Sequence, residues 1–265
     1  MVFDTTPGLL SPITIKGRTV RNRIVMPPME SHLSLPDGSV TQDHLKRYVP
    51  RAAAGVGLVI VEHSYVVADG RTGNDQLGIH DDALIEGHFT LSKGIKDAGA
   101  VAGIQLNHGG GKVSSVCSGH QPVSASIGVV PRCQEECRPA TIAEIEQYQI
   151  DFANAARRAV KAGYDLVEIH GAHGYLLSQF LSPLVNSRED QYGGDAERRA
   201  ALPCAVVRAV REAVGPDCWV QYRLGALDYR EGGLDTAAAV AAARMLVAAS
   251  VDVIHISGGV HGPQA

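Results

Sequence analysis

The sequence predicts an α/β fold in which parallel strands alternate with helices around a (β/α) barrel. Short runs of consecutive apolar residues alternate with longer helical patterns along the whole chain. Such runs are typical of strands buried on both faces of a sheet covered by helices. The length of 265 residues suits one domain, since a barrel of this kind takes about 250 residues. We predict a single domain over residues 1–265.

Six strands are expected, preceded by a hairpin. The hairpin covers residues 13–20, with a turn at Lys16-Gly17. The predicted strands are residues 24–26, 56–61, 101–106, 166–169, 219–224 and 251–257. Glu62 and His63 are expected at the end of the second strand, and His170 directly after the fourth.

Helices are predicted between the strands from their capping residues. Thr41, Thr141 and Asp195 are suitable N-caps, and Thr141 with Glu144 forms a capping box. The predicted helices are residues 41–54, 81–98, 141–162, 195–215 and 236–249. Residues 107–140 lack periodicity and are rich in Gly, Pro, Ser and Cys, so a long functional or mobile loop is expected there.

Composition excludes several classes of partner. The net charge of -4 gives no basic field for nucleic acid. The apolar runs are too short to span a membrane, and MVFDTTPGLL lacks the pattern of a signal peptide. Five cysteines, an odd number with irregular spacing, favour reduced thiols and a cytoplasmic protein.

His170 and His173 are the first candidates for chemistry, because catalytic groups gather at the carboxyl end of barrel strands. Two imidazoles there could together donate hydrogen bonds to an anionic or carbonyl oxygen. They could also bind a metal, although no known zinc spacing is present. The alternative is a structural role, in which both histidines lie in a loop and form hydrogen bonds with the backbone.

Arg223 and Gln105 interrupt two apolar strands. A buried cation is costly unless it is paired, so Arg223 either faces an anionic ligand or forms an ion pair with Glu168 or Asp228. The amide of Gln105 also needs partners. If the two side chains converge, they suit a polar heterocycle in a mostly apolar cavity.

Weaker signals lie nearby. Tyr175 could donate a proton or could simply pack. Glycines at 109–111 and 258–259 follow strands and either allow close approach of a ligand or form turns. Cys117, Cys133 and Cys137 match no standard metal spacing, so we predict no metal site.

Four segments together resemble the Old Yellow Enzyme family of FMN-dependent oxidoreductases. They are NRIVMPPM (22–29), GIQLNHGG (103–110), EIHGAHGYLLSQFLSPLVNSREDQYGG (168–194) and YRLGALDYREGG (222–233). The last segment and the ending SGGVHG are similar to the branch of 2,4-dienoyl-CoA reductases, enoate reductases and NADH oxidases. The resemblance runs through essentially the whole chain.

The resemblance implies a site for the FMN ring. Pro28, Met29 and Glu30 would line the ring, and Gln105 would bind its pyrimidine edge. Arg223 would stabilise the negative charge of the reduced ring. By the same resemblance, His63 and His170 would also contact the cofactor.

The resemblance also implies the reaction. NADH or NADPH would reduce the flavin, which would pass hydride to an activated C=C bond of a small enone, enoate or dienoyl thioester. His170 and His173 would bind the activating oxygen, Tyr175 would deliver the proton, and His261 would assist it. Relatives that oxidise or demethylate amines are the alternative.

Two departures from the family pattern stand out. Glu30, His32 and His63 occupy positions where relatives carry Cys or Thr, Tyr and a small residue, respectively. The chain also has six strand units where the family barrel has eight. The missing two would carry the FMN phosphate loops, and a [4Fe-4S] cluster would belong only to a longer form.

We therefore expect a TIM-type (β/α)8 barrel that is incomplete at its C-terminus. It would act as a homo-oligomer or be completed by further C-terminal sequence. The alternatives from other classes are a flavin-free fragment that binds an assembly partner and a metal-dependent hydrolase.

Overall fold

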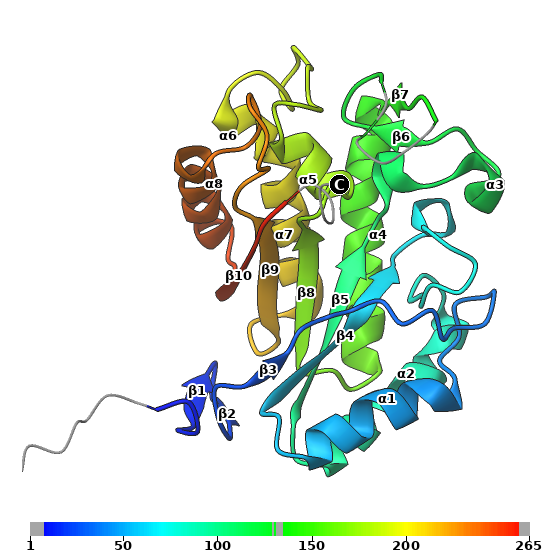
Figure 1. The fold of residues 1–265 in the computed structure, drawn as a ribbon, viewed down its shortest axis with the longest axis vertical. Coiled ribbons are helices and arrows are strands. Elements are labelled where there is room, and N and C mark those ends of the chain that lie inside the picture. Colours follow the sequence, from blue (N-terminus) through cyan, green and yellow to red (C-terminus); the bar gives the residue numbers. More distant parts are fainter. Residues whose placement is uncertain (1–7, 129, 131–134, 260–265) are drawn as a thin grey trace, which may run out of the picture.

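A computed structural model of the chain describes residues 8–128, 130 and 135–259. His261, a predicted catalytic residue, and Cys133 lie outside these residues. Within them, a curled sheet of six parallel strands forms the centre, and the long helices cover its outer side (Figure 1). This arrangement confirms the predicted α/β architecture of a partial barrel.

The strands follow one another across the sheet almost in chain order. The spatial order is β3 (Val25–Met26), β4 (Leu58–Tyr65), β5 (Val101–Asn107), β8 (Leu166–Gly171), β9 (Trp219–Gly225) and β10 (Val253–Ser257). All neighbouring pairs are parallel. Their carboxyl ends therefore meet at one edge of the sheet.

Two short pairs of strands lie outside the main sheet, one antiparallel and one parallel. β1 (Ile13–Ile15) and β2 (Arg18–Val20) form the predicted hairpin. β6 (Val123–Ser124) and β7 (Arg138–Pro139) pair in parallel within the segment expected to be a loop. Figure 1 shows these two pairs at opposite ends of the main sheet.

Five long helices cover the sheet. They are α1 (Gln42–Ala53), α2 (Ile85–Asp97), α4 (Ile142–Lys161), α7 (Ala201–Val214) and α8 (Thr236–Ala248). Shorter turns are α3 (Ser115–Ser118), α5 (Leu176–Leu181), α6 (Ala196–Arg199), η1 (Ala68–Gly70), η2 (Asp82–Leu84) and η3 (Gly110–Lys112).

Thr41, Thr141 and Asp195 all occupy N-cap positions as predicted, and the side chains of Thr141 and Asp195 accept backbone hydrogen bonds. The Thr141 hydroxyl accepts a hydrogen bond from the Glu144 N–H at 3.2 Å, and the Glu144 carboxylate accepts one from the Thr141 N–H at 2.8 Å. Asp195 caps α6 by accepting from the Arg198 N–H at 2.8 Å. Each cap satisfies backbone donors that a helix start leaves unpaired.

Several predicted boundaries were wrong. Glu62 and His63 lie inside β4, beside a bulge between Val61 and His63, and His170 lies inside β8. These polar side chains are tolerated in buried strands because each has hydrogen-bond partners, those of Glu62 lying on α1 and at Ser31. The helix predicted over 195–215 is two helices, α6 and α7, and α5 was not predicted.

The two outer strands of the sheet each have one neighbour. β3 pairs only with β4, and β10 only with β9, within the described residues. Val25 is 43% exposed and Ile256 is 62% exposed on these strands. Between them opens an apolar hollow of about 320 Å³, to which Trp219 of β9 and the β1–β2 hairpin contribute. The interior of the barrel is therefore open on this side.

Candidate active site

A cavity of about 380 Å³ lies at the carboxyl end of the sheet. Ten residues from the strands and the loops after them line it: Pro28, Glu30, His63, Gln105, Lys112, His170, His173, Tyr175, Arg223 and Gly258. Eight of these were predicted as catalytic or cofactor-binding residues. Met29 does not line the cavity and is 57% exposed.

Arg223 is the main positive group of the cavity. Its Nη1 donates to the Pro28 carbonyl at 3.3 Å, and its Nε is buried without a hydrogen-bond partner. Burial lowers the pKa of Arg223, while the Glu168 charge acts in the opposite direction. Arg223 forms no ion pair with any described carboxylate, so a guanidinium donor remains available to a ligand.

The alternative, an ion pair of Arg223 with Glu168 or Asp228, does not form among the described residues. Glu168 accepts hydrogen bonds from Gln105, Gln221 and His255 instead. Asp228 accepts from the Ser182 hydroxyl at 2.6 Å and from the Leu234 N–H at 2.7 Å. Both carboxylates are already satisfied by donors in their own surroundings.

His170 and His173 face each other at the end of β8. His170 Nδ1 accepts a hydrogen bond from the Ala172 N–H at 3.4 Å, so its proton lies on Nε2. That Nε2 is 3.4 Å from His173 Nδ1. His173, which has a φ of 59°, also places its Nε2 2.6 Å from the Ser257 hydroxyl of β10.

Both histidines are held neutral. Burial lowers the pKa of His170 well below its ordinary value, and the charges of His173 and His63 act in the same direction. Burial, followed by the charges of Arg223 and Lys112, lowers the pKa of His173 to about 4. A neutral imidazole has one N–H donor and one nitrogen acceptor. The N–H group of each histidine can therefore donate a hydrogen bond to an oxygen of a ligand.

Tyr175 lines the cavity, and its ring packs against the rings of His170 and His63. Its ring centroid is 5.0 Å from that of His170 and 5.3 Å from that of His63. Burial raises the pKa of the phenol, and the charge of Glu30 raises it further. Lys112 Nζ lies 4.7 Å from the ring centroid and donates to the His173 carbonyl at 2.8 Å. The phenol therefore keeps its proton at neutral pH.

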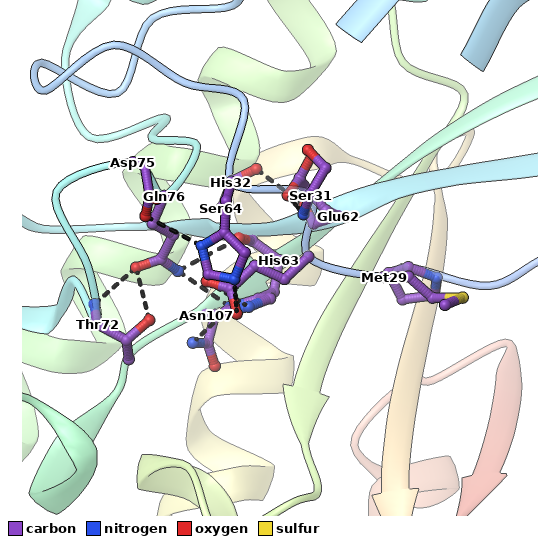
Figure 2. Close-up of polar contacts among 12 residues, drawn as sticks. Met29, Ser31, His32, Glu62, His63, Ser64, Thr72, Asp75, Gln76 and Asn107 are labelled. Carbon is purple, nitrogen blue, oxygen red and sulfur yellow. Dashed lines mark hydrogen bonds and ion pairs between the residues drawn. The ribbon is translucent and has the colours of Figure 1, made fainter. Parts of the chain in front are cut away.

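The tautomer of His63 is fixed by Gln76 (Figure 2). Gln76 Oε1 accepts from the Thr72 N–H at 2.7 Å, so Gln76 Nε2 is the donor to His63 Nδ1 at 3.0 Å. The remaining proton of a neutral His63 is then on Nε2, which lies 3.5 Å from Glu30 Oε1.

Glu30 is a carboxylate within the cavity. Burial opposes its ionisation, but the hydrogen bond and charge of His63, with the charge of His32, outweigh burial and lower the pKa of Glu30. His32 Nε2 is 3.8 Å from Glu30 Oε2, and its Nδ1 is 3.0 Å from Asp75. Glu30 therefore adds a negative charge to the cavity that Arg223 also lines.

The loop that carries Glu30 is fastened by its neighbour Ser31. The Ser31 N–H donates to Glu62 Oε2 at 2.5 Å, and its hydroxyl donates to Glu62 Oε1. Tyr48 of α1 also donates to Glu62 at 3.2 Å. Figure 2 shows Ser31 beside Glu62, whereas Met29 lies apart from these contacts.

Sequence reasoning missed Lys112, Ser257 and Gln76. Lys112 follows the glycines in the loop after β5, and Ser257 is the last residue of β10, so their positions at or just after strand ends were a usable signal. Gln76 lies in a loop without a pattern, and only the tertiary structure brings it to His63.

Comparison with known proteins decides the family. Residues 8–259 match the model of the NADH:flavin oxidoreductase / NADH oxidase family, and the solved structures that resemble this fold include an old yellow enzyme homologue. The chain belongs to the Old Yellow Enzyme family. FMN is the cofactor of this family and NAD(P)H its electron donor.

Relatives of the chain are longer than it is. The NADH oxidase of Thermoanaerobacter brockii is 40% identical over 257 residues, which are 96% of this chain and 40% of that protein. The NADPH dehydrogenase of Bacillus licheniformis is 41% identical over 254 residues, 95% of this chain and 73% of the relative. The chain thus spans two fifths to about three quarters of their lengths.

Solved structures of Old Yellow Enzyme type share the fold. A complex of 2-naphthoyl-CoA reductase with 2-naphthoyl-CoA has a TM-score of 0.92 at 28% identity and covers 97% of this chain and 41% of its own. The old yellow enzyme homologue from Zymomonas mobilis has a TM-score of 0.87 at 30% identity, covering 94% and 73%. Morphinone reductase with tetrahydroNAD has a TM-score of 0.86 at 29% identity, covering 94% and 73%.

The described residues fit the ring of FMN. The buried Nε of Arg223 lacks a partner, and a polar cavity of suitable size opens beside it.

In the described part of the chain, no three His, Cys, Asp or Glu side chains are placed to hold a metal ion. No helix among these residues is both long and apolar enough to cross a membrane.

Proposed function

We propose that this chain carries the flavin-ring and substrate half of an FMN-dependent NAD(P)H oxidoreductase that reduces an activated C=C bond. The observation that supports this most directly is the convergence of Arg223 and Gln105 with His170, His173 and Tyr175 on one cavity. A cation suited to a reduced flavin and donors suited to a substrate oxygen then share a single site.

When bound, FMN would supply two-electron chemistry by accepting hydride from NAD(P)H and passing it to a substrate carbon. The guanidinium of Arg223 would stabilise negative charge on the ring, because it has a buried donor without a partner. Pro28 and Glu30 would lie against the ring, with His63 beside Glu30.

His170 and His173 would bind the oxygen that activates the C=C bond. Each would donate one N–H, which withdraws electron density from the conjugated carbons. For both to donate, His173 must carry its proton on Nδ1, with Ser257 donating to its Nε2. An oxygen placed between His170 Nε2 and His173 Nδ1 would replace their 3.4 Å contact.

Tyr175 would deliver the proton that completes the reduction. A hydride added at the β-carbon would move the electron pair of the C=C bond to the α-carbon, and Tyr175 would transfer its phenol proton there. The raised pKa of Tyr175 supports this role because it keeps the donor protonated. Solvent would then reprotonate the phenolate.

Conjugated acyl thioesters and enones are the substrates we favour. The related structure with 2-naphthoyl-CoA holds an acyl thioester conjugated to an aromatic ring. Amine oxidation is the alternative, because histamine dehydrogenase from Rhizobium has a TM-score of 0.83 at 25% identity. Assays with an enone, an enoyl thioester and histamine would separate these reactions.

The first experiment is an absorption spectrum of the purified chain before and after addition of FMN and desalting. We expect retained flavin absorbance that is bleached by NADH or NADPH without oxygen. A colourless chain that binds neither FMN nor the phosphate-free lumiflavin would contradict the proposal. Binding of lumiflavin without retention of FMN would indicate that the ring site is present but the phosphate site is elsewhere.

The substrate pair is tested with phenol, which should stack on the bound flavin and give a long-wavelength charge-transfer band. Replacing both His170 and His173 with Ala should abolish this band. Replacing the exposed His120, which lies 69% exposed outside the cavity, with Ala is the matched control. A band that survives the double substitution would place the oxygen-binding pair elsewhere.

We further propose that two more strand–helix units cover the open edges β3 and β10. The exposed apolar residues on these edges and the greater length of the relatives support this. Native mass spectrometry would distinguish a longer chain from a second copy.

We expect a cytoplasmic protein, because the described cysteines Cys117, Cys137, Cys204 and Cys218 form no disulfide.

A further inference from the structure

A row of three polar side chains crosses the floor of the cavity. Gln105 of β5 pairs in register with Glu168 of β8, which pairs in turn with Gln221 of β9. Glu168 is 0% exposed and does not line the cavity, whereas Gln105 does. The carboxylate therefore lies beneath the site, and only the Gln105 end of the row reaches it.

Glu168 receives hydrogen bonds from three directions. Gln105 Nε2 donates to Oε1 at 2.7 Å, and His255 Nδ1 lies 2.7 Å from Oε2. Gln221 Nε2 also donates to Oε2. A carboxylate with these partners acts only as an acceptor, so the atom of each amide that faces it must be the NH₂ group.

This rule fixes the direction of the Gln105 amide. With Nε2 committed to Glu168, the carbonyl Oε1 is the atom left for the cavity that Gln105 lines. The cavity then offers an acceptor from Gln105 and a donor from Arg223. Such a pair matches a ring edge on which an N–H stands beside a carbonyl.

We propose that Glu168 is a positioning residue that holds the carbonyl of Gln105 toward the cavity, so that the site selects a ring with an imide N–H. This inference rests on the proposed flavin function, which it deepens by assigning the selectivity to a residue that does not touch the ligand. Without Glu168, the Gln105 amide could rotate and present its NH₂ group to the cavity instead. Two hydrogen-bond donors, this NH₂ group and the imide N–H of the ring, would then face each other.

The test uses two ligands that differ at this N–H alone. Lumiflavin carries the imide N–H, and 3-methyllumiflavin has a methyl group in its place. Quenching of ligand fluorescence on titration with the full chain gives both affinities. We expect the unaltered chain to bind lumiflavin about tenfold more tightly or better, because methylation leaves a buried acceptor unpaired.

Glu168→Gln keeps the shape of the side chain and removes the acceptor-only character. We expect it to weaken binding of lumiflavin and to leave binding of 3-methyllumiflavin nearly unchanged. The ratio of the lumiflavin affinity to the 3-methyllumiflavin affinity should therefore fall toward one. Gln221→Met is the matched control, since it also removes one hydrogen bond to Glu168 but changes nothing at the cavity. Its ratio should equal that of the unaltered chain.

A double-substitution cycle shows whether Glu168 acts through Gln105. Gln105→Met alone should bring the ratio near one, and adding Glu168→Gln should change it no further. Equal weakening of both ligands by Glu168→Gln would show a merely structural role and overturn the proposal. So would 3-methyllumiflavin binding as tightly as lumiflavin to the unaltered chain.

A measurement without substitutions covers the case in which Glu168→Gln does not fold. The NH₂ signals of Gln105 in a ¹⁵N-labelled, ligand-free chain should be protected from exchange with water. Rapid exchange would overturn the positioning. Protected signals in a chain that binds neither flavin would overturn the proposed function and support the positioning.

Discussion

The imidazole of His173 and the hydroxyl of Ser257 lie 2.6 Å apart, and this contact joins the loop after β8 to the end of β10. Two residues separated by 84 positions in the chain thus share a hydrogen bond, and its direction depends on the tautomer of His173. If Ser257 donates to His173 Nε2, the proton of His173 is on Nδ1, on the side of His170.

Ser257→Ala should therefore weaken binding of phenol. We expect a loss of about three- to tenfold, because one supporting hydrogen bond is removed while both histidines remain. Equilibrium titration of the flavin-loaded protein with phenol measures this. Ser257→Thr, which keeps the hydroxyl, should restore binding, and equal losses in both variants would argue against the tautomer explanation.

Arg223→Met should separate ligand binding from stability. Lumiflavin should bind at least tenfold more weakly, because the buried guanidinium donor is gone. The free energy of unfolding should stay the same or rise, since Arg223 is largely buried without an ion pair among the described residues and Met removes the cost of burying its charge.

Arg223→Lys is the control for charge alone. It keeps a cation but loses the planar guanidinium, so lumiflavin affinity should lie between the other two. Urea unfolding and fluorescence titration on all three proteins check both halves of the prediction. A large loss of stability in Arg223→Met, with unchanged flavin binding, would mean that Arg223 serves the fold.

Gly171→Ala should destabilise the barrel beside His170. A Cβ at this position would lie 1.9 Å from the Tyr222 hydroxyl, a clash that neither strand can relieve by a small shift. We expect a loss of about 3 kcal/mol or more in urea unfolding, at the upper end of overpacking effects. Gly225→Ala, whose nearest contact would be 3.4 Å, should cost much less.

His88 should make the protein less stable in mild acid. Burial lowers its pKa to about 4, against an ordinary value of 6.5. Between these values the unfolded chain takes up a proton that the folded chain does not. The free energy of unfolding therefore falls as pH is lowered from 6.5 toward 4, by about 1.4 kcal/mol per pH unit for this group.

Urea unfolding at a series of pH values measures that slope. His88→Gln should reduce it by about one proton over this range, whereas His120→Gln, at an exposed position, should leave it unchanged. An identical slope in the His88 variant and the unaltered chain would show that His88 is protonated in the folded protein.

Local sequence signals determined much of this molecule. The capping box of Thr141 and Glu144, the turn at Lys16-Gly17 and the apolar runs of the strands depend on neighbouring residues. Each of these elements formed where it was predicted, although the ends of several strands differ. The family motifs also led to most of the residues that line the cavity.

Only the tertiary structure decided which polar groups meet. Glu168 was a candidate partner of Arg223 by sequence, yet strand register places it between Gln105 and Gln221. Gln76 and Ser257 reach the histidines from distant segments. Hydrogen-bond direction depends on which donors and acceptors face one another in space, and the order of residues along the chain does not contain that information.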